Sequence, residues 1–308
     1  MIVPESLQEK IESRLGDISS LPTLPSAVMQ INELVNKDDV SMKQIESFME
    51  MDPVLSSTAL KMVNSSFYGM AQEISSLRLA LVILGLKEIK NLVLSLSVFR
   101  LFSDRNLNGK FDIRHFWHHS ATAGQIAKSL SSRLRLQFAG EEFVGGLIHD
   151  IGRVVLVKCL PEEYPELHRE AHEQGIPLWK VEEEEFGFHH GHVGGWLGIR
   201  WKLPRKLVTT LVYHEHPGET PEYHQLVGVI SLASTLSQMS LNGEQELFQE
   251  FHLEEHPALQ LLLENTVGLE SVNWENFVNQ LGEEVRQSAE FVYLSQQNLW
   301  EEEVSETG

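Results

Sequence analysis

The stretch from Ala139 to Leu160, AGEEFVGGLIHDIGRVVLVKCL, constrains the fold most, because it is apolar at helical spacing around one polar pair. Leucine, isoleucine and valine recur at intervals of three and four residues on both sides of His149 and Asp150. This is the period of a helix face that is buried in a protein core. The stretch therefore predicts an interior helix that carries a His-Asp pair.

Two interpretations of the pair are open from these residues alone. Neutral imidazole and carboxylate both bind divalent metals, and adjacent side chains on a helix diverge by only about 100°, so one ion could contact both. The alternative is a buried histidine that is hydrogen-bonded to a capping aspartate. Gly145, Gly146 and Gly152 would let another segment come close to this turn in either case.

The rest of the chain also predicts helices. Period-two alternation is absent, and the short connections between apolar periodic segments mostly carry Pro or Gly. Near the C-terminus, helices are expected at residues 257–265 and 272–294. We predict an all-α fold in which the N-terminal helices, up to about Phe102, pack against the rest. Leu77, Leu81, Leu84 and the run 92–99 carry too much apolar surface to face water.

Composition limits the compartment and the partners. The single cysteine, Cys159, cannot form an intramolecular disulfide, and neither a signal peptide nor a run of roughly 20 apolar residues is present, so we expect a cytoplasmic protein without a membrane span. The net charge is −20, which argues against nucleic acid as the main partner. Of this charge, −14 lies in residues 242–308, where 15 glutamates face one arginine.

Histidine occurs at three further helical segments. His119 follows Trp117 and His118 in a helix with inward-packing alanines, His190 lies at a helix start, and His214 lies at a helix end beside Glu215. A helical bundle can bring such residues together in its interior. In contrast, His168 and His172, which also have the spacing of metal ligands on a helix, are expected to face solvent. The four consecutive glutamates Glu182 to Glu185 are expected to face solvent as well.

The order of these segments resembles the HD superfamily of metal-dependent phosphohydrolases. The segments are the His119-Ser120 helix, GGLIHDIG, FGFHHGHVGGWLGIRWKLP and the YHEHP turn. The N-terminal third resembles more narrowly the HDOD family, the HD-related output domains of bacterial signalling. The residues that carry this second likeness are LPTLP, Asp52-Pro53, Asn64-Ser65, Tyr68-Gly69 and Leu84-Gly85. Together the two likenesses cover about residues 19–240.

The resemblance implies a metal site and also departures from it. Carried over by motif, His119, His149 and Asp150 match the superfamily's first metal ligands, and His190 and His214 match the histidines that the HD-GYP branch adds. Ser234 stands where the superfamily has its distal aspartate, Glu215 stands where a second histidine is usual, and His189 stands where HDOD relatives commonly have aspartate. A hydroxyl brings no charge to offset a divalent cation. The candidate ligands are therefore an incomplete set: His119, His149, Asp150, His190, His214 and Glu215.

These observations lead to one functional hypothesis with two rivals. The chain is expected to be a non-catalytic bacterial signalling module that acts by binding an unidentified signalling protein, since the HDOD resemblance implies no common reaction. The rivals are a divalent-metal phosphohydrolase acting on a nucleotide or cyclic dinucleotide, and a sensor of a metal or small ligand. The cofactor expected under the metal hypotheses is Mn, Fe, Mg, Ni or Zn. The oligomeric state is left open.

We also expect a division of the chain into three parts. These are an N-terminal helix at 1–18, an HDOD domain at 19–240 and an acidic helical extension at 241–308. Within the HDOD domain, residues 19–102 would form the N-terminal helical part and residues 103–240 the HD-like part, so that the bundle carries an N-terminal helical subdomain packed on it.

Overall fold

Every regular element in the described part of the chain is helical, as the sequence predicts. In this computed structural model the described residues are 2–16, 18, 21, 42–50, 56, 60, 63–64, 70, 72–83, 85, 111–138, 140–241, 253–269, 272–274 and 277. Several expectations fall on residues outside these ranges, namely those on LPTLP beyond Leu21, Asp52-Pro53, Ser65, Tyr68-Gly69, Leu84, the run 92–99, and most of the helix at 272–294 and of the acidic extension.

The helices in the described ranges are α1 (Glu5–Leu15), α3 (Met42–Glu50), α6 (Ile113–Arg133), α7 (Glu141–Ile148), α8 (Ile151–Cys159), α9 (Glu163–Gln174), α10 (Leu178–Phe186), α11 (His190–Arg200), α12 (Arg205–Tyr213), α13 (His224–Leu241) and α15 (Pro257–Asn265), with short 3-10 helices η2 (Pro217–Glu219) and η3 (Leu253–Glu255). From α6 to α13 the helices follow one another with short connections. None of the helices in the described ranges has the length and hydropathy of a membrane span.

Two apolar cores hold the bundle together. The larger core is formed by side chains of α6 to α12 with α1 against them, and its largest fully buried residues include Trp117, Trp196 and Tyr164. The second core lies between α6, α13 and α15 and includes Ile126, Leu130 and Ile230. Since α6 contributes Trp117 to the first core and Ile126 to the second, the first half of this helix lies where the two cores meet.

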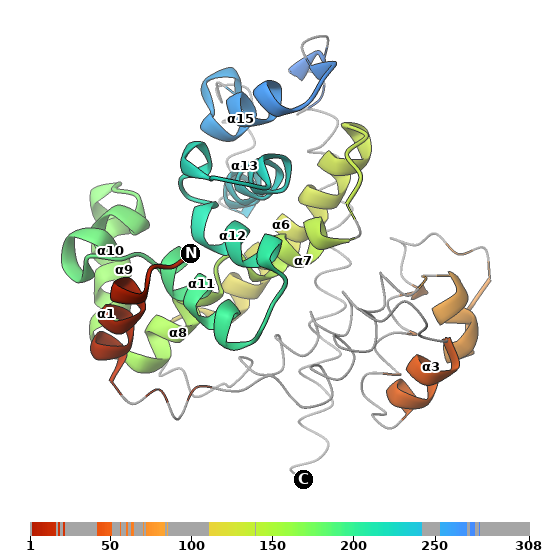
Figure 1. The fold of residues 1–308 in the computed structure, drawn as a ribbon, viewed down its shortest axis with the longest axis horizontal. Helices are drawn as coiled ribbons and strands as arrows, with labels where there is room; N and C mark the ends of the chain where they lie inside the picture. Colours follow the sequence, from red (N-terminus) through yellow and green to blue (C-terminus); the bar gives the residue numbers. More distant parts are fainter. Residues whose placement is uncertain are drawn as a thin grey trace.

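The first helix packs directly on the HD-like part. Ile11 and Leu15 of α1 are buried in the larger core, and Glu12 accepts a hydrogen bond of 3.0 Å from Trp196 Nε1 on α11. In Figure 1 α1 lies beside α9, α10 and α11. The N-terminal helix thus belongs to the same packed body as the bundle, although about 100 residues separate it from α6.

The N-terminal helical part forms a small core of its own at the side of the bundle. Val63, Ile74 and Ala80 are buried together, and Asn64 links two parts of this region: its side-chain oxygen accepts from Ile74 N at 2.6 Å and its amide donates to Ile74 O at 2.7 Å. Figure 1 shows α3 on this same side of the molecule. Asn64, one of the residues behind the HDOD resemblance, is therefore a structural link.

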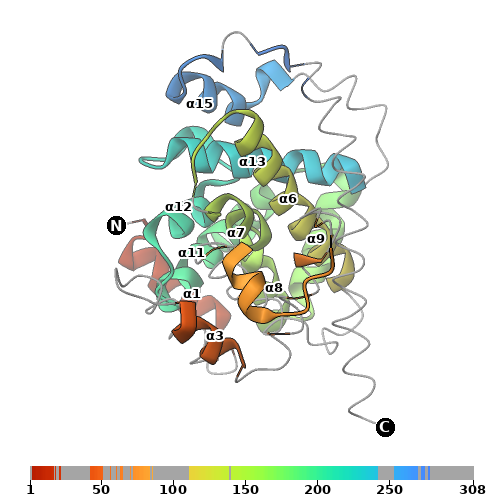
Figure 2. The same cartoon turned by 90° about the vertical axis from the view of Figure 1, so that its right-hand side faces the viewer.

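Part of the acidic extension, residues 253–269, packs on the bundle. The predicted helix at 257–265 is confirmed as α15, which lies over α13 in both Figure 1 and Figure 2. Gly228 on α13 lets α15 lie close, because a Cβ there would stand 2.9 Å from Leu262 Cγ. Leu259 and Leu262 are fully buried in the second core.

The His-Asp pair lies at a break between two helices, where the sequence predicts one continuous helix. The helix α7 ends at Ile148, and α8 begins at Ile151. The expected role of glycine at this turn is confirmed, because a Cβ on Gly152 would stand 1.9 Å from the carbonyl oxygen of His190. Close contact between α8 and the start of α11 brings the turn with His149 and Asp150 next to His190.

Candidate metal centre

The structure brings all six candidate ligands together where the two cores meet. They come from four places in the chain: α6, the α7–α8 turn, the start of α11 and the end of α12. Two groups of potential metal ligands, each with atoms within 4.8 Å of one another, share Asp150: His119, His149 and Asp150 form one, and Asp150, His190, His214 and Glu215 form the other. The expected gathering of these side chains is thus observed.

Asp150 lies at the centre of the cluster. Its Oδ1 is 3.2 Å from His190 Nε2, 3.3 Å from His214 Nε2 and 3.7 Å from His149 Nε2. Its Oδ2 is 3.8 Å from His119 Nε2. Four imidazole nitrogens therefore face one carboxylate from different directions.

Local hydrogen bonds orient the imidazole rings. The Nδ1 atom of His149 lies 2.7 Å from Gly146 O, and that of His214 lies 2.9 Å from Leu211 O. Because a carbonyl only accepts, each Nδ1 carries a proton, which leaves Nε2 of each ring toward the centre of the cluster. There His190 Nε2 and His214 Nε2 are 3.3 Å apart.

Ser234 lies in the cluster as the resemblance implies for the distal position. Its Oγ is 3.0 Å from His149 Nε2, which is also 3.2 Å from His119 Nε2. The hydroxyl donates to a nitrogen whose lone pair is free, so Ser234 completes a hydrogen bond at this position and adds no negative charge. The helix α13 is held to α6 here by Ser237 Oγ, which donates to His119 O at 2.9 Å.

Two groups that were expected to face solvent belong to the cluster's surroundings. Glu182 is fully buried and accepts a hydrogen bond of 2.6 Å from His190 Nδ1, while Glu183 to Glu185 are exposed as expected. His168 is half-buried, with its Nε2 2.7 Å from Arg153 Nη2, whereas His172 is exposed. Sequence reasoning missed both because burial of a polar residue depends on how α9 and α10 lie against the bundle.

Sequence reasoning also missed Arg153, the counterion of the central carboxylate. Its Nη1 lies 2.7 Å from Asp150 Oδ2, and its side chain is 15% exposed. The spacing of three residues, with Arg153 in the first turn of α8, was the available signal. The guanidinium balances one carboxylate in a place where an unpaired charge would be costly.

His189 has a structural role at the start of α11. It is the N-cap residue, and its Nδ1 accepts from Gly191 N at 3.0 Å. An aspartate, the residue that the resemblance implies for this position, caps helices by the same kind of bond. The departure at His189 therefore preserves the cap without adding a ligand to the cluster.

Burial and neighbouring charge set the protonation states in opposite directions. Loss of solvation lowers the pKa of His119 to about 3 and that of His149 to about 4. Burial alone would also lower the pKa of His190, but Glu182 and Asp150 raise it well above its usual value. Burial raises the pKa of Asp150, and His149, Arg153 and His190 outweigh this and hold it well below its usual range. The cluster without metal therefore stabilises a positive charge on His190.

The donor set fits a divalent transition metal. Ligand atoms around an ion with bonds of about 2.0–2.1 Å lie roughly 3.3–3.4 Å apart in a tetrahedral shell and roughly 2.8–3.0 Å apart as neighbours in an octahedral shell. Asp150 Oδ1, His190 Nε2 and His214 Nε2 are separated by 3.2, 3.3 and 3.3 Å, and Glu215 Oε1 is 3.3 Å from His190 Nε2. His119 Nδ1 is buried and has no hydrogen-bond partner among the described residues. The residues present thus fit a metal, with nitrogen donors that suit Zn, Fe or Ni better than Mg.

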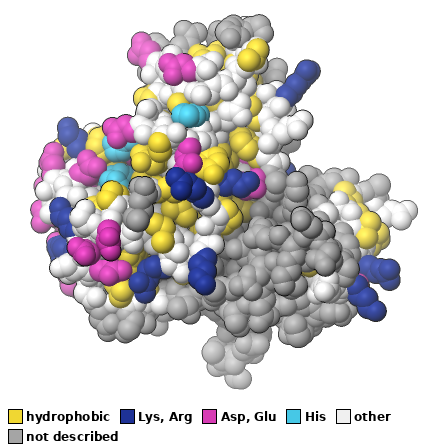
Figure 3. Space-filling model, in the orientation of Figure 1, with side chains coloured by type: hydrophobic (Ala, Val, Ile, Leu, Met, Phe, Trp, Pro, Cys, Tyr) yellow, Lys and Arg dark blue, Asp and Glu magenta, His cyan; other side chains and the backbone are white. Residues whose placement is uncertain are grey.

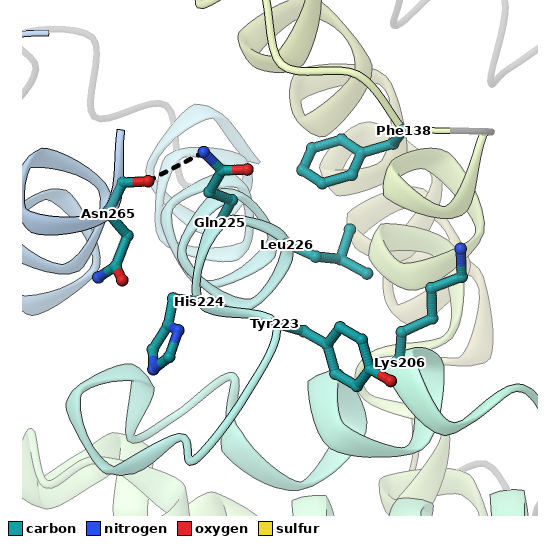
Figure 4. A pocket seen from close by; sticks show the side chains of 7 residues that line it. All are labelled: Phe138, Lys206, Tyr223, His224, Gln225, Leu226 and Asn265. Atoms are coloured by element: carbon teal, nitrogen blue, oxygen red, sulfur yellow. Dashed lines mark hydrogen bonds between the residues drawn. The ribbon is translucent and has the colours of Figure 1, made fainter. Parts of the chain in front are cut away.

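A separate surface pocket lies away from this cluster. It has a volume of about 440 Å³ and is lined by Phe138, Lys206, Tyr223 to Leu226 and Asn265, as Figure 4 shows. Two of its polar side chains have partners within the protein: Lys206 pairs with Glu141, and Gln225 donates to Asn265 O and Thr266 Oγ1, both at 3.0 Å. No cluster residue lines it, so we assign the candidate site to the histidine cluster.

Helical architecture and the histidine-aspartate cluster define an HD-type domain, and comparison with known proteins specifies which kind. The family model of the HDOD domain matches residues 21–217. The chain therefore belongs to the HDOD family. The matched range contains the six candidate ligands and stops before Ser234 and α15.

Solved structures share the fold. An HDOD domain protein of unknown function from Geobacter sulfurreducens superimposes with a TM-score of 0.77 at 24% identity, covering 93% of this chain and 97% of the other. A protein of Shewanella amazonensis whose name gives phosphohydrolase as a provisional function has a TM-score of 0.70 at 22% identity, covering 94% and 97%. Both likenesses support the HD-like helical fold.

A curated relative is longer than this chain. An uncharacterized protein of Treponema pallidum (strain Nichols) is 26% identical over 252 residues, which are 79% of this chain and 48% of the relative. The chain spans about half the length of this relative.

Proposed function

We propose that this chain is a non-catalytic HDOD regulatory domain of a bacterial signalling system, with an incomplete phosphohydrolase-type metal site and a cytoplasmic protein partner. The observation that carries the proposal is the position of Ser234. Its hydroxyl lies 3.0 Å from His149 Nε2, where the superfamily resemblance implies a carboxylate ligand. The HDOD fold, whose family is one of signalling output domains, supports the regulatory role.

The candidate metal ligands remain His119, His149, Asp150, His190, His214 and Glu215, which lie in two groups that share Asp150. A bound divalent ion would supply a Lewis acid that lowers the pKa of a water toward ~7. The chain's own residues supply up to four imidazoles and two carboxylates, and one of these carboxylates, that of Asp150, already faces Arg153. Without the distal carboxylate, the charge that offsets the ion is smaller, so we expect weaker binding than in a complete site.

A second candidate, a metal-dependent phosphohydrolase, has one specific observation in its favour. Six potential ligands converge on a few ångströms of space, which is more than a purely structural cluster needs. In this alternative Glu215, whose side chain is 30% exposed, would take over the charge that Ser234 does not provide. The substrate would be a nucleotide or cyclic dinucleotide phosphodiester. A third reading, a metal or ligand sensor, uses the same cluster without turnover.

One experiment separates the first two candidates. Metal content of the purified protein is measured by mass spectrometry, and hydrolysis of bis(p-nitrophenyl) phosphate and of a cyclic dinucleotide is measured with added Mn²⁺. The non-catalytic proposal expects no turnover above that of the Asp150→Ala variant. Metal-dependent hydrolysis that both His149→Ala and Asp150→Ala abolish would overturn it and support the phosphohydrolase.

The acidic side of the molecule is the proposed partner face. Residues 161–187, which contain α9 and α10, have nine glutamates against Arg169 and Lys180, and all of the glutamates except the buried Glu182 lie at or near the surface. Figure 3 shows acidic side chains gathered along this margin of the molecule. A basic protein surface would complement it.

Charge reversal tests the proposed face. Proximity labelling in bacterial cells would compare the wild type with a triple variant, Glu183→Lys, Glu184→Lys and Glu185→Lys. The proposal expects loss of a labelled partner with a basic surface, while matched reversal of the exposed Glu219, Glu255 and Glu264 should leave that labelling unchanged. Equal labelling of that partner by all three proteins would place the contact elsewhere.

A further inference from the structure

Glu182 differs from the three glutamates that follow it. Its side chain is 0% exposed, whereas that of Glu183 is 41% exposed. The four acidic residues end α10 just before the turn that leads to α11. Only the first of them points into the protein, and a carboxylate in such a place is costly unless its oxygens are hydrogen-bonded.

Both carboxylate oxygens of Glu182 are used. Its Oε2 accepts from the backbone N of His190 at 2.8 Å and from His190 Nδ1 at 2.6 Å. Its Oε1 accepts from the hydroxyl of Tyr164, on α9, at 2.5 Å. The carboxylate is thus fixed by a hydrogen bond from Tyr164 on one side, and on the other side it orients His190.

The hydrogen bond between Glu182 and Nδ1 determines which nitrogen of His190 is available to bind a metal. Because Glu182 accepts the Nδ1 proton, Nε2 is the ring nitrogen that is left to bind an ion, and it lies 3.2 Å from Asp150 Oδ1 and 3.3 Å from Glu215 Oε1. A carboxylate behind an imidazole fixes the ring's orientation and makes its Nε2 a stronger donor. His149 and His214 have uncharged backbone carbonyls in the same place.

We infer that Glu182, braced by Tyr164, is a positioning residue that makes His190 the principal nitrogen ligand of the cluster. The inference rests on the proposed metal site and assigns the ion to the half with His190, His214, Glu215 and Asp150. In the other half, the Ser234 hydroxyl donates a hydrogen bond to His149 Nε2, so the lone pair of this nitrogen is already engaged. Glu182 itself does not reach the ion.

Metal affinity gives the first test. Glu182→Gln can keep an oxygen toward His190 and removes the charge, so we expect the affinity for Zn²⁺ or Ni²⁺, measured by calorimetry, to fall about 10- to 100-fold. Tyr164→Phe should lower the metal affinity less, since this change removes only the hydrogen bond from Tyr164 to Glu182. The exposed neighbour gives the matched control, because Glu183→Gln should bind the metal like the wild type. Circular dichroism and thermal unfolding of each variant report the fold.

The state of the His190 ring in metal-free protein gives a second test that needs no metal. With nitrogen-labelled histidine, the wild type should show a slowly exchanging, downfield Nδ1 proton on His190, and Glu182→Gln should move it upfield. Together the two tests distinguish failure of the proposed metal site from failure of the positioning role of Glu182. A wild-type protein that binds neither Zn²⁺ nor Ni²⁺ would refute the proposed metal site. The Nδ1 proton signal of His190 would then still test whether Glu182 orients the ring. A folded Glu182→Gln protein with unchanged affinity and an unchanged ring signal would refute the positioning role.

Discussion

Ser234 Oγ lies 3.0 Å from His149 Nε2, so a neutral hydroxyl completes the cluster where the superfamily resemblance implies a charged ligand. The family resemblance implies that Ser234 occupies the distal ligand position, and α13 carries this side chain to the His-Asp turn. The hydrogen bond explains how the protein keeps His149 satisfied without a carboxylate. It also identifies Ser234 as the position where a single substitution to a carboxylate would change the metal affinity of the cluster.

Ser234→Asp should raise metal affinity without a matching gain in turnover. The new carboxylate would face His149 and add charge that offsets a divalent ion, and outer-shell partners alone are worth about 10- to 100-fold in affinity. We therefore expect at least a tenfold gain for Mn²⁺ or Zn²⁺ by calorimetry. Gln238→Asp, one turn further along α13 at an exposed position, is the matched control. Equal affinity of the two variants and the wild type would show that Ser234 does not face the ion.

Asp150→Asn should destabilise the protein even without metal. The change leaves Arg153 without the carboxylate that lies 2.7 Å from it, and breaking a buried pair on one side typically costs about 3–5 kcal/mol. Urea denaturation of metal-free protein measures the effect. The double variant Asp150→Asn with Arg153→Met should recover part of the loss, because no uncompensated charge then remains. A double variant less stable than the single one would contradict this account.

The metal-free protein should lose stability as the pH falls below about 6.5. Burial lowers the pKa of His119 to about 3 and the pKa values of His149 and His168 to about 4, so between those values and the usual pKa the unfolded chain binds more protons than the native state. The free energy of unfolding therefore decreases on acidification. His190 has the opposite sign, since its pKa is raised in the fold and its contribution is fully present at low pH. Urea midpoints at pH 7 and pH 5 check the net direction, and a higher midpoint at pH 5 would show that His190 dominates.

Leu262→Ala should destabilise the whole bundle, although Leu262 lies outside the matched family range. The side chain is fully buried against Gly228 of α13, and a leucine-to-alanine change in a core costs about 2–5 kcal/mol. Glu264→Ala, on the exposed side of the same helix, should have little effect. Thermal unfolding of both variants provides the measurement. If the two variants unfolded alike, α15 would not belong to the cooperative unit.

Local sequence pattern determined the helices and most of the candidate ligands. Apolar residues at spacings of three and four are repeated along the chain, and the resulting all-α fold is confirmed. Proline and asparagine mark the ends of α15, whose predicted bounds agree with the structure. The histidines lie at helix ends or on inward faces, which are local properties. For this reason His190 and His214 could be placed at a helix start and a helix end before any tertiary contact was known.

Tertiary structure alone decided which polar residues surround the ligands. Glu182 and Glu183 are adjacent and chemically identical, yet one is buried behind His190 and the other is exposed, because the angle of α10 to α11 sets their surroundings. The break between α7 and α8 likewise follows from the close approach of His190 to Gly152, a contact between segments almost 40 residues apart. Periodicity reports which face of a helix is apolar, whereas the free energy of a buried charge depends on partners that only the packed chain brings within hydrogen-bond distance.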